Sequence, residues 1–166
     1  MNPNYLDILT EKGSLTDLFG KLMGQSPSLN CLVQGRGPVN RYESYVLNTA
    51  PRLFAHIREI TMGTSDKDWL FARTVIPLST LRGRSSRLRK MGKTPLGKIL
   101  FGSLNAKRVQ MHLDLVFADE VGLDNGDIPL DFPLWQRTSL FELATGPLLI
   151  TEIFLPDCPL YEISKQ

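Results

Sequence analysis

The strictest pattern in the chain lies between Arg108 and Phe117. Every second residue there is apolar, and the residues between them are mostly polar: Val109, Met111, Leu113, Leu115 and Phe117 alternate with Gln110, His112, Asp114 and Val116. A period of two is typical of a β-strand that buries one face and exposes the other. The chain therefore has to supply partner strands and a cover for that buried face.

Further segments supply the partners. Residues 53–62 and 69–77 flank a polar turn at 63–66, and residues 134–143 and 148–155 flank the Ala-Thr-Gly-Pro sequence of 144–147. Both arrangements are typical of hairpins. Shorter extended segments are expected at 29–33 and 42–47, with a turn at 35–38.

Two helices are expected. Ser14, with Asp17 three residues later, predicts a helix that starts at Ser14 and ends near Gly24. The second expected helix is capped by Thr94, begins at Pro95 and ends at Gly102. With loops at 82–93 and 119–132, the sum is an α+β fold. We expect a single antiparallel β-sheet with a few short helices, in one domain over residues 1–166.

Composition narrows the function classes. The chain has 19 Lys and Arg against 17 Asp and Glu, a net charge of +2 that does not call for a polyanionic partner. Its longest apolar runs, about ten residues, fall short of the ~20 needed to cross a bilayer. The N-terminus lacks a basic leader, so a cytoplasmic protein is expected. Cys31 and Cys158 lack a C-x-x-C spacing, and both are expected to be free thiols.

Several chemistries lack their sequence signals. His56 and His112 have no second histidine or acidic residue at metal-binding spacing, and no serine lies in a G-x-S-x-G context. The acidic turn at 124–127 lacks the closing glutamate of a calcium loop, and no glycine-rich phosphate loop occurs. These absences indicate that the chain uses no nucleotide, no metal ion and no covalent nucleophile.

Two charges interrupt apolar strands. Alternation places Arg73 with Trp69, Phe71 and Val75, and it places Glu152 with Leu148, Ile150 and Phe154. A buried ion needs a partner of opposite charge, a ligand or a changed protonation state. Either the two residues are structural ions, paired with each other or with other groups, or they line an internal cavity for a small anion. In the second case Arg73 would bind a carboxylate and Glu152 a hydroxyl.

Two further features bear on anion binding. The backbone N–H of Leu96 is a free donor at the start of the second helix, which either meets a carboxylate or faces water. The basic segment Arg82–Lys93 lacks the aromatic residues that stack on nucleic-acid bases. A solvated loop that at most steers an anionic substrate is the simpler interpretation.

Three blocks together resemble bacterial chorismate lyases. They are FARTVIPLSTL at 71–81, GKTPLGKILF at 92–101 and LLITEIFLPDCPLY at 148–161, and the similarity extends more weakly through Trp69, 134–137 and 14–16. The resemblance implies an enclosed ligand cavity and a cofactor-free lyase that converts chorismate to 4-hydroxybenzoate and pyruvate, the first step toward the ubiquinone ring. It also implies a monomer whose ligands are chorismate and 4-hydroxybenzoate, with no nucleic acid and no stable membrane insertion.

The resemblance also implies residue roles. Arg73 would bind the ring carboxylate, assisted by the Leu96 N–H, and Glu152 would contact the ring hydroxyl. A main-chain contact would come from near Leu15. Two departures are the long stretch at 113–133 and the arginine-rich segment at 82–90.

Two other functions stay open at this point. One is a noncatalytic domain that binds small carboxylates, because the effector domains of some transcription regulators resemble the lyase fold. The other is a module that binds nucleic acid or membrane surfaces through the basic segment, which salt-sensitive binding to a polyanion would reveal.

Overall fold

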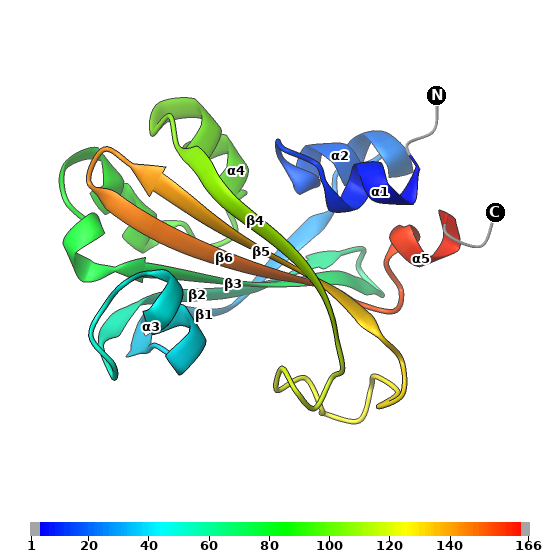
Figure 1. The fold of residues 1–166 in the computed structure, drawn as a ribbon. Helices are drawn as coiled ribbons and strands as arrows, with labels where there is room; N and C mark the ends of the chain where they lie inside the picture. The colour runs from blue at the N-terminus through cyan, green and yellow to red at the C-terminus, as the bar shows by residue number, and fades with distance from the viewer. Residues whose placement is uncertain (1–3, 164–166) are drawn as a thin grey trace.

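A single antiparallel sheet forms the centre of the computed structural model, which describes residues 4–163 (Figure 1). The sheet has six strands in the order β1-β2-β3-β6-β5-β4. Their bounds are β1 Ser28–Pro38, β2 Phe54–Gly63, β3 Asp68–Pro77, β4 Lys107–Val116, β5 Leu134–Leu143 and β6 Gly146–Phe154. All five neighbouring pairs are antiparallel, which confirms the expected α+β class.

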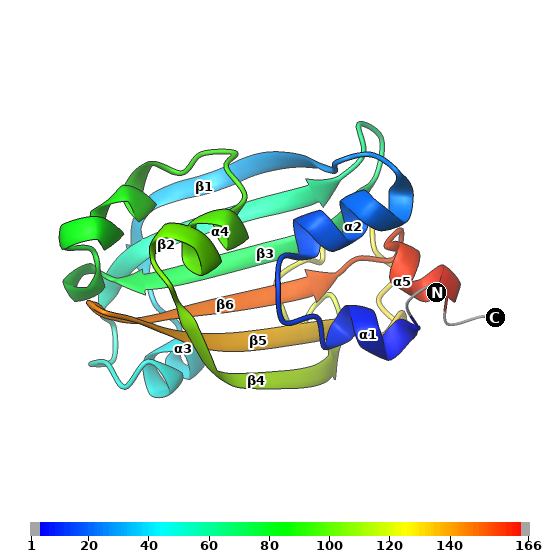
Figure 2. The same cartoon turned by 90° about the horizontal axis from the view of Figure 1, so that it is seen from above.

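Short helices cover both faces of the sheet (Figures 1 and 2). On one face lie α1 (Tyr5–Leu9), α2 (Leu15–Met23) and α4 (Leu96–Lys98), which continues into a π-helical turn, η3 (Ile99–Ser103). The 3-10 helices η1 (Leu78–Thr80) and η2 (Gly83–Lys90) lie at one end, and α5 (Pro159–Ile163) follows β6. The opposite face carries α3 (Arg41–Val46) and the loop 117–133.

The predicted helix at Ser14 is confirmed. The Ser14 side chain accepts a hydrogen bond from the Asp17 N–H, and Gly24 ends α2 in the left-handed conformation with φ of 70°. Phe19 of α2 packs on Trp69 of β3 with 5.7 Å between ring centroids. This contact fixes α2 over the sheet face that will carry the cavity.

Three local predictions are wrong. The expected extended segment at 42–47 is the helix α3, because Asn40 and Glu43 form a reciprocal capping box. Strand β1 runs through the turn expected at 35–38, since those residues pair with β2. The expected loop at 82–93 contains η2, in which Leu88 and Ser85 are buried.

The second predicted helix is confirmed with different bounds. Pro95 caps α4 in an extended conformation, so the helix begins at Leu96 and its second half is the π-turn η3. No helix within residues 4–163 is long and apolar enough to cross a membrane.

Candidate functional site

A cavity of about 70 Å³ lies between the sheet and the helices α2 and α4. One water molecule needs roughly 10–15 Å³ of such cavity volume. The cavity therefore has room for several water-sized groups. The sheet contributes residues of five strands, β1, β2, β3, β5 and β6. The helical side contributes residues 13–16 together with Leu96, Gly97, Leu100 and Phe101. The lining residues with polar side chains are Ser14, Thr16, Arg58, Thr74 and Glu152.

Arg58 supplies the positive charge of this cavity. It lies on β2 and is 3% exposed. Its Nε and Nη2 donate to the Gly92 carbonyl at 3.2 and 2.8 Å, and Nη2 also donates to the Thr94 carbonyl at 2.9 Å. Within the described chain it forms no ion pair with a carboxylate. Burial lowers the pKa of Arg58, as expected for a cation removed from water without a counterion.

Glu152 supplies the negative charge. It lies on β6, and its Oε2 accepts from Nε of Arg137 on β5 at 2.6 Å. The two residues stand directly opposite each other in the β5–β6 register. No other described residue donates to this carboxylate, so Oε1 is left for a ligand.

Two helical segments cover the cavity, at the starts of α2 and α4, and these two covers are in close contact. Leu15 begins α2 and Leu96 begins α4, and both line the cavity. Their expected main-chain contacts with a ligand stay predictions. A Cβ at Gly97 would lie 3.1 Å from Cβ of Ser14 and 3.2 Å from its Oγ. A larger residue at position 97 would therefore require Ser14 or α4 to shift by a few tenths of an ångström.

The prediction that Arg73 and Glu152 converge in one cavity is wrong. Arg73 pairs in register with Thr151, whereas the partner of Glu152 is Ala72. Paired residues of adjacent strands point to the same side of a sheet, so Arg73 and Glu152 point to opposite sides. Trp69, which alternation places on the face of Arg73, packs instead on α2 at the cavity side, where the β2–β3 register is irregular. Alternation within one strand also does not tell which of its faces adjoins which face of the next strand.

Arg73 instead belongs to an ion-pair network under the opposite face. Its Nε donates to Oε1 of Glu43 at 2.6 Å, and its Nη1 donates to Oε1 of Glu59 at 2.7 Å. Burial alone would lower the pKa of Arg73, but the hydrogen bonds with these two carboxylates raise it above its ordinary value. With its charge already balanced, Arg73 holds α3 to the sheet.

The sequence did contain a signal for Arg58. It interrupts the apolar run of 53–62 as Arg73 interrupts that of 69–77. The alternation of 53–62 looks loose because both faces of β2 are covered and nearly all of its residues are buried. Arg137 is also interior, at 1% exposed, and was considered only for its likeness to the family.

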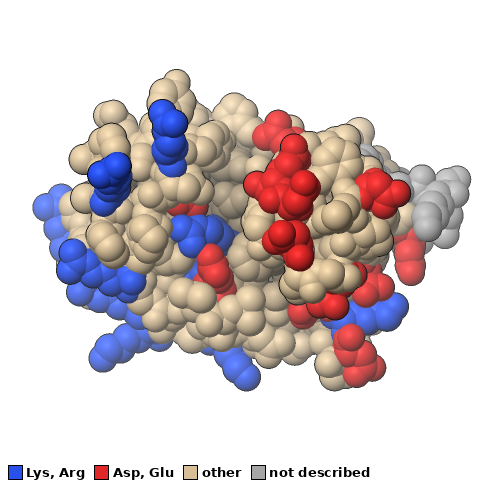
Figure 3. Space-filling view, turned by 90° about the horizontal axis from the view of Figure 1, so that it is seen from below, with Lys and Arg blue, Asp and Glu red and all other residues tan. Residues whose placement is uncertain are grey.

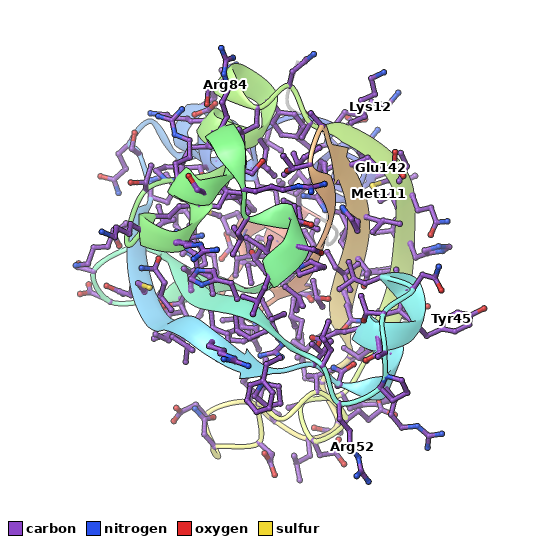
Figure 4. All side chains as sticks on the ribbon, turned by 90° about the vertical axis from the view of Figure 1, so that its left-hand side faces the viewer. Lys12, Tyr45, Arg52, Arg84, Met111 and Glu142 are labelled. Atoms are coloured by element: carbon purple, nitrogen blue, oxygen red, sulfur yellow. The ribbon has the colours of Figure 1, made fainter. Side chains whose placement is uncertain are left out.

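Charge is divided between the two ends of the molecule (Figure 3). No Asp or Glu occurs between Asp68 and Asp114, and the exposed basic side chains of Arg82–Lys98 lie in this stretch. Arg84, for example, points away from the body of the protein (Figure 4). The loop 117–133, at the other end, carries exposed acidic residues. Among the described residues no cluster of His, Cys, Asp and Glu suits a metal ion.

Comparisons with known proteins place this site in context. The family model described as chorismate lyase matches residues 1–165. A chorismate pyruvate-lyase of Escherichia coli is 35% identical over 161 residues, which cover 97% of this chain and 88% of that protein. A protein of the same name from Hamiltonella defensa is 42% identical over 124 residues, 75% of this chain and 61% of that protein.

Solved structures share the fold at much lower identity. The effector domain of PhnF from Mycobacterium smegmatis has a TM-score of 0.61 at 15% identity, covering 87% of this chain and 90% of that one. The C-terminal domain of a histidine utilization repressor from Pseudomonas syringae has a TM-score of 0.57 at 12% identity, covering 78% and 92%. These likenesses describe the arrangement of the sheet and helices and nothing finer.

Proposed function

Because the chain belongs to the chorismate lyase family, we propose that it eliminates pyruvate from chorismate and leaves 4-hydroxybenzoate. The observation that carries the proposal is the buried Arg58 guanidinium without a carboxylate partner among residues 4–163. Such a cation is stabilised when an anion enters the cavity beside it. The ring carboxylate of chorismate or 4-hydroxybenzoate is that anion.

The other lining groups complete the recognition of the ring. Leu96 begins α4, where backbone N–H groups have no partner within the helix, and its N–H assists Arg58 with the carboxylate. Glu152 accepts a hydrogen bond from the ring hydroxyl through its free oxygen. The backbone at Leu15 supplies a further contact with the ring. Arg58 takes the role that the family resemblance had attached to Arg73.

The reaction needs no nucleophile from the protein. The bond between ring C3 and the ether oxygen breaks, the hydrogen on C4 leaves as a proton, and the ring becomes aromatic. The released enolpyruvate takes up a proton on its methylene carbon and becomes pyruvate. The protein's task is therefore to fix the ring and place charge around it, with Arg58 at one end and Glu152 at the other.

We take the active enzyme to be a monomer, as the family resemblance implies. The alternative of a noncatalytic effector domain rests on structural neighbours of 12–15% identity, whereas the relatives at 35–42% identity are named as lyases.

The proposal is tested by incubating the purified protein with chorismate. We expect a new aromatic absorbance and release of pyruvate in equal amounts, the latter detected by a coupled lactate dehydrogenase assay. Tight binding of 4-hydroxybenzoate without any turnover of chorismate would contradict the proposal and favour a ligand-binding role.

A further inference from the structure

We propose that Arg137 is a positioning residue that couples the orientation of Glu152 to closure of the N-terminal segment over the cavity. The inference rests on the proposed function, because it assigns the contact with the ring hydroxyl to Glu152. Arg137 does not line the cavity itself and lies behind the carboxylate.

The first half of this coupling is the ion pair. The Arg137 side chain is 1% exposed and that of Glu152 is 14% exposed, with 2.6 Å between Nε and Oε2. A hydrogen bond to an ionised group in such surroundings is short and directional. It fixes which of the two Glu152 oxygens faces the cavity.

The second half is a contact with the chain that covers the cavity. The Nη1 atom of Arg137 donates to the carbonyls of Leu9 and Glu11 at 3.3 and 2.9 Å. These residues end α1 and begin the linker to α2, and the cavity lining starts two residues later at Gly13. One planar guanidinium therefore holds the carboxylate and the covering segment in a fixed relation.

A neighbouring arginine provides a natural comparison. Arg108 of β4 also donates to this linker, through Nη1 to the Glu11 and Lys12 carbonyls at 3.2 and 3.0 Å. It makes no hydrogen bond to Glu152, although Arg137, Glu152 and Glu11 all act on its charge. Burial and the nearby Arg137 lower the pKa of Arg108. Arg108 thus secures the linker without touching the carboxylate.

The coupling has a mechanical consequence. When residues 9–13 move away to admit substrate, Arg137 loses its carbonyl partners and Glu152 loses a fixed orientation. When the segment closes, the same contacts return the carboxylate to its place. The reactive arrangement is thereby assembled only in the covered state, in which bulk water is excluded.

The first test compares the kcat and KM of Arg137→Met with those of Arg108→Met. We expect kcat to fall about 10²-fold in Arg137→Met, the scale of a misplaced catalytic group. Its KM should stay within about threefold of the wild type, because the contacts with the ring carboxylate are kept. Arg108→Met should keep the kcat of the wild type. Equal kcat values for the two variants would reduce Arg137 to a structural role and overturn the inference.

The second test does not require an Arg137 variant to fold. Hydrogen exchange is measured on peptides covering residues 6–16 in the wild type and in Glu152→Gln. Loss of the ion pair should free Arg137 and speed exchange there about tenfold, while peptides of β2 keep the wild-type rate. Unchanged exchange at 6–16 would overturn the coupling and leave the proposed function intact. Absence of chorismate turnover by the wild type would instead refute the proposed function, whatever the exchange shows.

Discussion

Arg58 and Glu152 line the same cavity from strands separated by β3, and the guanidinium and the carboxylate do not pair with each other. The register accounts for this arrangement. Arg58 lies opposite Thr74, Thr74 lies opposite Ile150, and Glu152 is the next residue of β6 on the same face. Two opposite charges are thus held apart at a cavity wall, which suits a ligand that is an acid at one end and a hydroxyl at the other.

Replacing Glu152 by Gln tests the negative end of the cavity. The amide keeps the size of the side chain but leaves Arg137 buried without a counterion, so the free energy of unfolding should fall by about 3 kcal/mol. We expect kcat/KM to fall at least about 10²-fold. Urea unfolding and steady-state kinetics measure the two effects.

The control for this variant is Glu142→Gln on β5, whose side chain points into solvent (Figure 4). It removes the same charge from the same sheet and should leave both quantities unchanged. If Glu152→Gln matched this control in activity, Glu152 would have no part in the reaction.

Gly97→Ala tests the contact between the two covers. The new methyl group would press on Ser14, whose Cβ would lie 3.1 Å away. The covers should separate by a few tenths of an ångström, and the affinity for 4-hydroxybenzoate should fall about three- to tenfold. Isothermal titration calorimetry measures this affinity.

Gly102→Ala in the same helical segment is the matched control, because a Cβ there would meet no atom within 4 Å. Its affinity should equal that of the wild type. Wild-type affinity in Gly97→Ala would show that α4 and α2 do not need this close approach.

The sequence predicts the positions of most strands. It does not predict which faces of neighbouring strands lie on the same side of the sheet. Alternation is clearest in the edge strand β4, where Met111 and Leu113 are half-buried and their neighbours are exposed. The expectation that one face of this strand is fully buried is wrong, because no residue of β4 is buried. Glu152, Leu15 and Leu96 could be selected by their local patterns together with the family resemblance, and all three line the cavity.

Arg58 and Arg137 could not be selected in the same way. Choosing between Arg58 and Arg73 requires the strand order β2-β3-β6 and its register, which depend on contacts between residues far apart in the chain. The helix α3 has a local signal in the capping box of Asn40 and Glu43, but Tyr42, Tyr45 and Val46 favour an extended segment.

His56 makes stability depend on pH. It is 7% exposed, and its Nε2 has no hydrogen-bond partner among the described residues. Burial, followed by the nearby Arg89 and Arg58, lowers the pKa of His56 below 6.5. The unfolded chain therefore takes up the proton first as pH falls, and folding stability contributed by the neutral ring is lost below about pH 6.5.

We expect the wild type to lose more stability between pH 7 and pH 5 than His56→Gln does. Urea unfolding of both proteins at the two pH values measures the difference. An equal loss in the two proteins would show that His56 titrates normally in the folded state.

The two cysteines should differ in reactivity. Burial raises the pKa of the Cys158 thiol to about 12, whereas Cys31 is partly exposed. Iodoacetamide at pH 8 should therefore modify Cys31 and spare Cys158 in the folded protein. Peptide mass spectrometry measures this, and Cys31→Ser should remove the adduct. Rapid modification of Cys158 in the native state would contradict its place in the core.

Binding of 4-hydroxybenzoate to Arg58→Met and Arg73→Met is the most direct test of the site. Circular dichroism at low temperature first confirms that both variants are folded, because Arg73→Met also leaves the buried Glu43 without its cation. The account predicts that Arg58→Met loses about 10²-fold or more in affinity, the scale of a charged hydrogen-bonded contact, while Arg73→Met stays within about threefold of the wild type. Loss of affinity in Arg73→Met together with wild-type binding by Arg58→Met would contradict it.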